Sequence, residues 1–236
     1  MSLAAADKLL KIFDALKNFR EGIPVPDPNP LAKKKESLLS KKERILHLNN
    51  IPELICSSAI RSLSEFPKIL AIAVDSLFSS CDDQESDVRL VAGESLNKLI
   101  KGLMDTFLGR IHVELYKEIK KNDSARGLRA ALSRFGDLCH LIRPHKCRPF
   151  IANLLPCIAR ISMRTEETIQ ETLATAMQKI MYVLGSFTSD TEVKQLLKTF
   201  LPNLRSSSAT TRRTAASGLL SFVDIRANQP SSMNGC

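Results

Sequence analysis

The sequence predicts an all-α fold built from stacked helix pairs, and three observations lead to that prediction. Ala, Leu, Lys, Glu and Ser are abundant in the 236 residues, whereas aromatic residues make up only 5%, a composition that favours helix over sheet. Runs of β-branched residues are short and scattered. A pattern of anchor residues returns about every 40 positions, each time after another helical stretch. The chain is also long enough to bury a large core.

Residues 1–20 are predicted to form an amphipathic helix. Apolar residues recur at helical spacing on one face, and lysines point elsewhere. The apolar positions are Leu9, Phe13, Leu16 and Phe19, and the lysines are Lys8, Lys11 and Lys17. A small apolar face with a cationic rim suits reversible binding to an anionic membrane surface. Docking of this helix on protein, or a disordered and solvent-exposed tail, are the alternatives.

Residues 21–37 are predicted to be a flexible linker. Four prolines fall within residues 24–30, and prolines so close together end a helix and favour an extended chain. The basic run at 33–44 carries six basic and two acidic side chains. This run loosely matches a nuclear-import signal, and the alternative is a solvated stretch of charges.

The folded body is predicted at 38–224, and an irregular tail at 225–236. Helical patterns near 38–48 and 52–65 precede the repeats. The anchor positions are Arg89, Arg129, Gln170 and Arg212. Successive anchors are 40, 41 and 42 residues apart. The helical stretches that precede the anchors are 67–80, 109–121, 147–162 and 190–204.

A period of this length that contains two helices is typical of a HEAT-type α-solenoid. One pair cannot bury its apolar face alone, so neighbouring pairs stack into a continuous core. We expect about four such pairs, with Pro67 and Pro149 in first helical turns, where no amide hydrogen bond is lost. A non-repetitive helical bundle is the alternative.

The anchors also suggest a ladder of polar contacts. Asp83 stands six residues before Arg89, and HEAT repeats carry such an Asp and Arg, which hydrogen-bond along the stack. By that resemblance, Arg89→Ala would leave an aspartate unpaired; a ligand contact is the alternative role for the arginine. The predicted ladder residues are Asp83, Arg89, Asp123, Arg129 and Arg212. The third repeat has Arg164 and Gln170 instead and the fourth has Ser206, so the ladder is expected to be weaker there.

Several segments resemble the amino-terminal region of the huntingtin family. They include ESDVRLVAGESLNKLIKGLMD (85–105), ELYKEIKKN (114–122), IQETLATA (169–176) and RRTAAS (212–217). The family's polyglutamine tract is absent. The resemblance implies a non-enzymatic scaffold in vesicle and organelle transport along microtubules and in autophagy. It implies transport, cytoskeletal and huntingtin-associated proteins as partners, and reversible membrane association through the helix at 1–20.

Motifs for catalysis, cofactors or metals are not found in the sequence. GxGxxG, GxxxxGK[ST], HExxH and GxSxG are absent, so neither an enzyme nor a small-molecule substrate is expected. The cluster Cys139, His140, His145 and Cys147 matches no usual zinc spacing, and we expect it at a turn between helices. Six cysteines without a CxxC pair, and no signal peptide or membrane span, indicate a reduced intracellular protein. A cytoplasmic location with membrane-associated and nuclear pools is expected.

The basic stretch 110–148 carries ten basic and four acidic side chains. It could form a cationic ridge for nucleic acid, although Tyr116 and Phe135 are the only aromatic residues offered near it for base stacking. The ridge would consist of Lys117, Lys120, Lys121, Arg126, Arg129 and Arg134. A solvated helical face that binds an acidic protein surface is favoured over nucleic acid. A nuclear-transport or cargo-adaptor solenoid is a further alternative.

Overall fold

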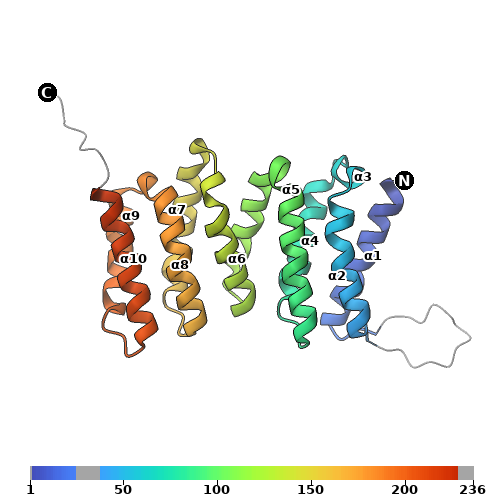
Figure 1. Cartoon of the computed structure of the whole chain (residues 1–236), viewed down its shortest axis with the longest axis horizontal. Helices are drawn as coiled ribbons and strands as arrows, with labels where there is room; N and C mark the ends of the chain where they lie inside the picture. Colours follow the sequence, from blue (N-terminus) through green and yellow to red (C-terminus); the bar gives the residue numbers. More distant parts are fainter. Residues whose placement is uncertain (1, 25–37, 228–236) are drawn as a thin grey trace, which may run out of the picture. The chain divides into compact units, whose positions relative to one another are not determined.

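The computed structural model describes residues 2–24 and 38–227, and all regular structure in these two ranges is helical. The α-helices, shown in Figure 1, are α1 (Ser2–Arg20), α2 (Lys41–Ile55), α3 (Ser58–Arg61), α4 (Phe66–Ser80), α5 (Ser86–Lys121), α6 (Ala125–Leu138), α7 (Pro144–Ile161), α8 (Glu167–Leu184), α9 (Asp190–Asn203) and α10 (Ala209–Ala227). Two short 3-10 helices, η1 (Cys139–Leu141) and η2 (Gly185–Phe187), follow α6 and α8. The all-α prediction is confirmed.

The chain divides into two compact units, unit 1 (Met1–Glu114) and unit 2 (Leu115–Cys236). Unit 1 contains α1, α2, α3, α4 and the part of α5 up to Glu114. In unit 2, α6, α8 and α10 lie side by side in one layer, and α7 and α9 pack behind them (Figure 1). The HEAT-type arrangement of helix pairs is therefore confirmed. The predicted linker falls largely on residues 25–37, and most of the predicted tail on 228–236, which lie outside the described residues.

Helix α5 contains the boundary between two predicted helices. Its backbone leaves helical geometry at Phe107, with φ −121° and ψ 20°. The break lies just before the predicted helical stretch 109–121, so one helix pair passes into the next through a kink rather than a loop. The Phe107 ring lies 4.5 Å from the ring of Phe66, at the start of α4. This contact fixes the kink against the helix that precedes it.

The anchor positions lead the second helix of each pair, and apolar residues around them fill the core. Val88, just before one anchor, is fully buried, as are Leu128 and Ile169 before two others. The positions four and eight residues further on recur on the same helical face. They are buried in every case except Leu219, which is half-buried. The period in the sequence is thus the period of the core.

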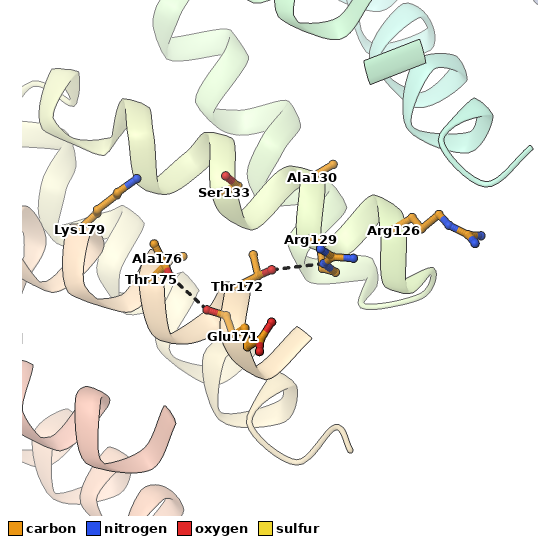
Figure 2. Close-up of a pocket in the computed structure, with 9 residues that line it drawn as sticks. All are labelled: Arg126, Arg129, Ala130, Ser133, Glu171, Thr172, Thr175, Ala176 and Lys179. Atoms are coloured by element: carbon orange, nitrogen blue, oxygen red, sulfur yellow. Dashed lines mark hydrogen bonds between the residues drawn. The ribbon is translucent and has the colours of Figure 1, made fainter. Parts of the chain in front are cut away.

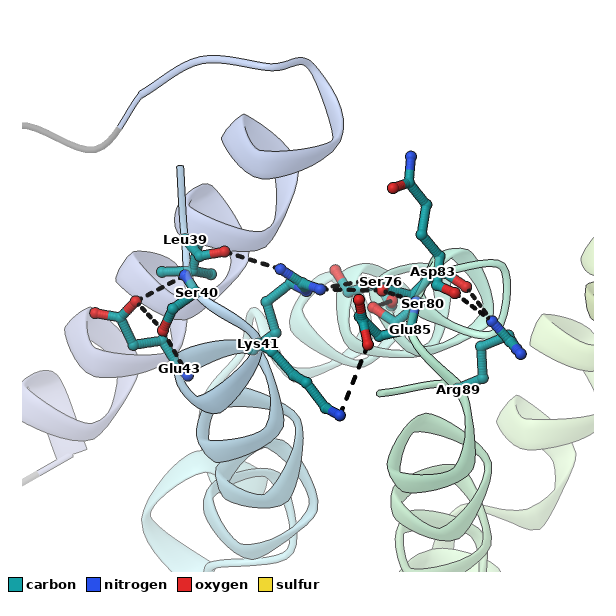
Figure 3. Close-up of polar contacts among 11 residues, drawn as sticks. Leu39, Ser40, Lys41, Glu43, Ser76, Ser80, Asp83, Glu85 and Arg89 are labelled. Atoms are coloured by element: carbon teal, nitrogen blue, oxygen red, sulfur yellow. Dashed lines mark hydrogen bonds and ion pairs between the residues drawn. The ribbon is translucent and has the colours of Figure 1, made fainter. Parts of the chain in front are cut away.

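Local signals set several helix ends. Gly22 has a φ of +69° and closes α1 with two hydrogen bonds, from its own N–H to the Phe19 carbonyl and from the Ile23 N–H to the Asn18 carbonyl. This pattern is a Schellman motif, so α1 ends at a glycine before the proline-rich stretch. Ser40 and Glu43 form a reciprocal capping box at the start of α2 (Figure 3), which satisfies two amide donors.

Two expectations about prolines and early helices need correction. Pro67 lies in the first turn of α4, as predicted. The assignment of Pro149 to a first turn is wrong, because α7 begins five residues earlier at Pro144, and that residue takes the first-turn position. The helical patterns near 38–48 and 52–65 are also redrawn. Helix α2 continues through Pro52, and only the short α3 follows it.

Helix α1 is packed onto unit 1. Leu9, Ile12, Phe13 and Leu16 are all at most 5% exposed, and α1 contacts α2, α3 and α4. Full burial of such side chains stabilises a fold by roughly 1.5–3 kcal/mol each. Helix α1 therefore belongs to the packed core of unit 1, where the sequence suggested a separate flexible helix. No helix within 2–24 or 38–227 is long and apolar enough to cross a bilayer.

Candidate functional site

The anchor side chains bind the loop before their own helix. Arg89 donates through Nη1 to the backbone carbonyls of Asp83 and Gln84, each at 2.8 Å (Figure 3). Arg212 repeats this arrangement with the carbonyls of Ser206 at 2.7 Å and Ser207 at 2.9 Å. Both arginines are the fourth residue of their helix. Their cations hold carbonyl groups that the turn between the paired helices would otherwise leave unpaired.

The carboxylate of Asp83 pairs with a residue that the sequence analysis did not single out. Arg44 forms an ion pair from Nε to Asp83 Oδ2 at 2.9 Å and a hydrogen bond from Nη2 to Oδ1 at 3.2 Å. Both side chains are at most 7% exposed. The expected dependence of this aspartate on Arg89 is wrong, since Arg89 contacts only its backbone. The ion pair that joins the first two helix pairs therefore comes from Arg44 of α2 and Asp83 in the turn before α5.

Arg44 also links α2 to α1. Its Nη1 donates to the Leu39 carbonyl at 2.9 Å, and its guanidinium lies over the Phe19 ring, 4.0 Å from the centroid. Arg44 is the fourth residue of α2, which is the position of Arg89 in α5. Helices α1 and α2 therefore correspond to one more helix pair, whose two members are separated by residues 21–40. A capping signal, SKKE at 40–43, was the clue in the sequence.

In the third repeat, where a weaker ladder was predicted, Gln170 and Arg164 form polar contacts of a different kind. Gln170 is fully buried and donates from Nε2 to the Arg164 carbonyl at 2.6 Å, so an amide replaces the arginine. Arg164 reaches back to the preceding repeat and donates to the carbonyls of Asn122 at 3.1 Å and Asp123 at 3.0 Å. Its ion pair with Glu166, helped by the backbone amide of that residue, lowers the glutamate pKa to about 2.

The second predicted ladder pair does not form as expected. Asp123 and Arg129 are both exposed. Arg129 donates from Nε to Thr172 Oγ1 at 3.3 Å. Thr172 lies in α8, the second helix of the next pair. The backbone carbonyl of Asp123 accepts from Arg164. Contacts between neighbouring repeats in unit 2 consequently use several residue types.

These contacts between repeats share one spacing. They join residues 39 to 44 positions apart in unit 2, close to the period read from the sequence. The pairs are Arg160 with Lys120, Lys179 with Asp137, Arg148 with Glu192, Gln178 with Ser217, Asn203 with Ser162 and Thr214 with Gln170. Their spacings run from 39 for Gln178 and Ser217 to 44. Repetition in the sequence is thus matched by repetition of polar contacts.

The residues predicted for membrane or partner binding divide into two groups. Leu9, Phe13 and Leu16 are buried against unit 1, and Phe19 stacks on Arg44. The three lysines of α1, namely Lys8, Lys11 and Lys17, are exposed. The docked helix therefore displays its cationic rim and hides its apolar face.

The cluster of cysteine and histidine residues lies at the turn between α6 and α7, as expected. The Cys139 thiol is buried and donates to the Gly136 carbonyl at 3.1 Å; burial raises its pKa to about 11. The Cys147 thiol is also buried, whereas His140 and His145 are exposed. The thiols therefore bond to backbone groups inside the turn while the imidazoles face solvent.

Unit 2 has a hollowed surface between α6 and α8 (Figure 2). It encloses about 460 Å³. Arg126, Arg129 and Lys179 contribute cations, and Glu171 contributes a carboxylate. Both arginines belong to the predicted cationic ridge. Another member, Lys121, pairs with Glu118 at 2.8 Å and is thereby neutralised. The ridge of the sequence analysis is therefore interrupted, and its exposed part faces a groove.

Comparison with known proteins decides the family. The model described as Huntingtin, N-terminal HEAT 1, matches residues 77–228. The chain belongs to this family. It is 53% identical over 221 residues to huntingtin from Takifugu rubripes, covering 93% of this chain and 7% of that protein. It is 23% identical over 309 residues to the HD protein homolog of Dictyostelium discoideum, covering 85% of this chain and 10% of that protein.

The family match extends from α4 to the end of α10, across the helix pairs that the anchors mark. The chain spans a tenth or less of the length of these two huntingtin-related proteins. A crystal structure of computationally designed armadillo repeat proteins for modular peptide recognition aligns at 12% identity and a TM-score of 0.39, over 89% of this chain and 81% of that one. At that TM-score the likeness carries no argument.

Proposed function

We propose that this chain is a non-enzymatic scaffold that binds other proteins. The observation that carries the proposal is the match to the huntingtin N-terminal HEAT family over 77–228. The polar anchors of these repeats bond to backbone groups inside the stack. Stacked pairs of this kind offer extended surfaces for partners, and exposed side chains of α6 and α8 supply such a surface.

The scaffold's setting is proposed from the family. Transport, cytoskeletal and huntingtin-associated proteins are its proposed partners, in vesicle and organelle movement along microtubules and in autophagy. The proposed location is the cytoplasm, with membrane-associated and nuclear pools. The test is quantitative affinity capture from native tissue with the full chain, against an unrelated helical-repeat protein of similar charge. Retention of the same proteins by both baits contradicts a specific scaffold.

Membrane association is proposed to require release of α1 from unit 1. The lysines of α1 are exposed while docked, and they would guide the helix to an anionic surface. Its apolar side chains are then exchanged between the core of unit 1 and the lipid interface. Binding therefore competes with docking, which makes the attachment reversible.

Hydrogen exchange on the full chain with and without phosphatidylserine vesicles tests this exchange. We expect vesicles to protect α1 while α2 and α4, which it covers, exchange faster. Phe13→Ser should reduce vesicle binding, whereas Leu10→Ser on the exposed face of α1 (48% exposed) should change it less. Vesicle binding with unchanged exchange in α2 and α4 would show that α1 stays docked and would contradict release.

A further inference from the structure

Two hollows adjoin on the surface of unit 2. The first, of about 460 Å³, lies between α6 and α8 (Figure 2). The second, of about 410 Å³, continues toward the end of α8 and is lined by Gly136 and Tyr182. Lys179 lines both hollows. Because they share this residue, the two neighbouring hollows are treated together and named here the α6–α8 groove.

Small residues create the groove. Gly136 lies so close to α8 that a Cβ atom there would be 3.3 Å from the Ala176 Cα. Ala130 and Ser133 also face this side, and none of these side chains is large enough to fill the space between the helices. Longer side chains along both helices stand at the rim. The groove is therefore built into the packing of the two helices and stays open to solvent.

The length of the groove suits an extended peptide. Helix α6 has 14 residues, so the groove follows it for roughly 20 Å. An extended chain rises about 3.3 Å per residue, and six or seven residues would fill this length. Ser133 and Thr175 line the middle. The Thr175 hydroxyl donates to the Glu171 carbonyl, so its oxygen can accept a hydrogen bond from a backbone N–H of a peptide.

The two ends of the groove differ in chemistry. Arg126 and Arg129 stand at one end. Arg129 donates from Nε to the neutral Thr172 hydroxyl, and Glu171 lines the same hollow, so this end carries two guanidinium groups and one carboxylate, a net positive charge. Tyr182 stands at the other end and is 90% exposed, and exposed aromatic residues are enriched where proteins bind one another. Between them Lys179 is already paired with Asp137.

We propose that the α6–α8 groove binds an extended segment of a partner protein that carries acidic residues at the Arg126–Arg129 end and an aromatic or large apolar residue at the Tyr182 end. The proposal rests on the proposed function as a protein-binding scaffold and gives that function a surface and a partner chemistry. Carboxylates of the segment pair with the guanidinium groups, which suit bidentate contacts. The apolar residue packs on the exposed tyrosine ring.

A nucleic acid strand fits this groove less well. Phosphates repeat along a strand and need a continuous row of cations. Glu171 and Asp137 line the same groove and interrupt such a row of cations. A peptide with a single acidic residue needs only the net positive charge of the Arg126–Arg129 end, where two guanidinium groups outnumber the Glu171 carboxylate.

A positional-scanning library of capped octapeptides, screened on the full chain, tests the proposal. We expect selection of Asp and Glu toward one end and of Phe, Tyr, Trp or Leu four to six positions away. The best peptide is then labelled with fluorescein and its affinity measured by anisotropy. Single-stranded oligothymidine is measured beside it. Absence of any residue preference, or tighter groove-dependent binding of oligothymidine, would overturn the proposal.

Two groove variants with matched controls locate the binding. Arg129→Glu reverses the charge at the acidic-binding end, and Lys198→Glu makes the same charge change on an exposed residue of α9. Thr175→Trp fills the groove without a charge change, and Thr191→Trp places the same ring on an exposed residue of α9. We expect each groove variant to weaken the peptide by at least about tenfold, and each control by less than about twofold.

The outcomes separate the groove from the scaffold function. Equal affinity of wild type and both groove variants, with melting curves unchanged, overturns the groove. If these variants also retain the same partners in affinity capture, the scaffold function stands without it. If the wild-type chain captures no specific partner, the scaffold function itself fails. Loss of peptide binding in folded Thr175→Trp, with Thr191→Trp unaffected, supports the groove even if Arg129→Glu proves unstable.

Discussion

At Arg44 one guanidinium holds three parts of unit 1 together. It pairs with Asp83 before α5, bonds to the Leu39 carbonyl before α2 and stacks on Phe19 of α1. A buried ion pair often adds little net stability, because desolvation of both charges offsets their attraction. Removal of one partner is a different matter, since the other charge is then left buried and alone.

We therefore predict that Arg44→Met lowers the free energy of unfolding by about 3–5 kcal/mol. The same change at Arg89 removes hydrogen bonds to carbonyl groups and leaves no buried charge, so a smaller loss of about 1–2 kcal/mol is expected. Urea unfolding followed by circular dichroism measures both. Lys42→Met, at an exposed position of α2, is the control. Equal losses at Arg44 and Arg89 would contradict the assignment of the aspartate to Arg44.

Glu166 gives a pH dependence of known sign. Hydrogen bonds from Arg164, with Nε 3.1 Å from Oε1 and 3.2 Å from Oε2, are the largest cause of its pKa of about 2, against an ordinary value of 4.5. A carboxyl whose pKa is lowered by folding stabilises the folded state above its unfolded pKa. That contribution is lost as the pH falls from about 4.5 toward 2.

The predicted result for Glu166→Gln is a lower melting temperature at pH 7 and a difference from wild type that shrinks as the pH falls through this window. The effect is small, because the glutamate side chain is 42% exposed and solvent screens the pair. Thermal melts between pH 7 and pH 2.5 measure it, with Glu167→Gln as the control for loss of one charge. A difference that grows on acidification would contradict the assigned role.

Sequence reasoning at this scale found the anchors but not all their partners. The spacing of Asp83 and Arg89 was visible, yet it does not say whether a carboxylate or a carbonyl accepts the bond. Arg44 was missed because the linker interrupts the period before α2. Gln170 looked like a loss of the anchor, although its amide donates to the same turn. Position in the repeat was predictable, whereas the choice among acceptors depends on three-dimensional geometry.

Among the elements, α1 differs most from the sequence-based picture. Its amphipathic pattern was correctly recognised, and the same pattern suits a lipid surface, a partner protein or the chain's own core. The docking of α1 depends on apolar surface offered by α2, α3 and α4. The pattern of α1 alone cannot reveal that surface. The kink of α5 was more predictable, because a helical stretch was predicted to begin at 109, two residues after Phe107.

Adjacent leucines in α1 test its docking. Leu9 is fully buried and Leu10 is 48% exposed. Leu9→Ala is predicted to destabilise unit 1 by about 2–5 kcal/mol, since it removes packed atoms and leaves a cavity. Leu10→Ala should change stability by no more than about 0.5 kcal/mol. Denaturant unfolding of both variants measures the contrast, and similar values for the two would contradict a docked helix.

On the scale of the whole molecule, the chain comprises two compact units, and the boundary between them in the sequence falls within α5. Helix α1 contributes its side chains to unit 1. Deletion of residues 1–20 is therefore predicted to increase hydrogen exchange in α2 and α4 and to leave exchange in α7 and α9 of unit 2 near the wild-type level. Mass spectrometry of exchanged peptides measures both. Equal loss of protection in the two units would show that they unfold as one.

The fold class could be predicted from the sequence because the same pattern of anchor and apolar residues occurs in each repeat. Each anchor was weak evidence alone, and four at nearly equal intervals were strong evidence. The α6–α8 groove was not predictable in this way. It depends on small residues such as Gly136 and Ala176, 40 positions apart, meeting across two helices. Sequence periodicity locates the helices, but the shape between them follows from their contact.

The separation of α1 from α2 has a consequence for the chain that connects them. Helix α1 ends at Arg20 and α2 begins at Lys41, so twenty residues of chain separate the two docked helices. The entropy cost of holding two points of a flexible chain together rises with the logarithm of the number of residues between them, by about 0.6 kcal/mol for each doubling. The burial of Leu9, Phe13 and Leu16 exceeds that cost several times over. We therefore expect the docked state to tolerate insertions between these helices. A longer insertion should raise the fraction of molecules in which α1 is released, while α1 still docks on unit 1 in most of them.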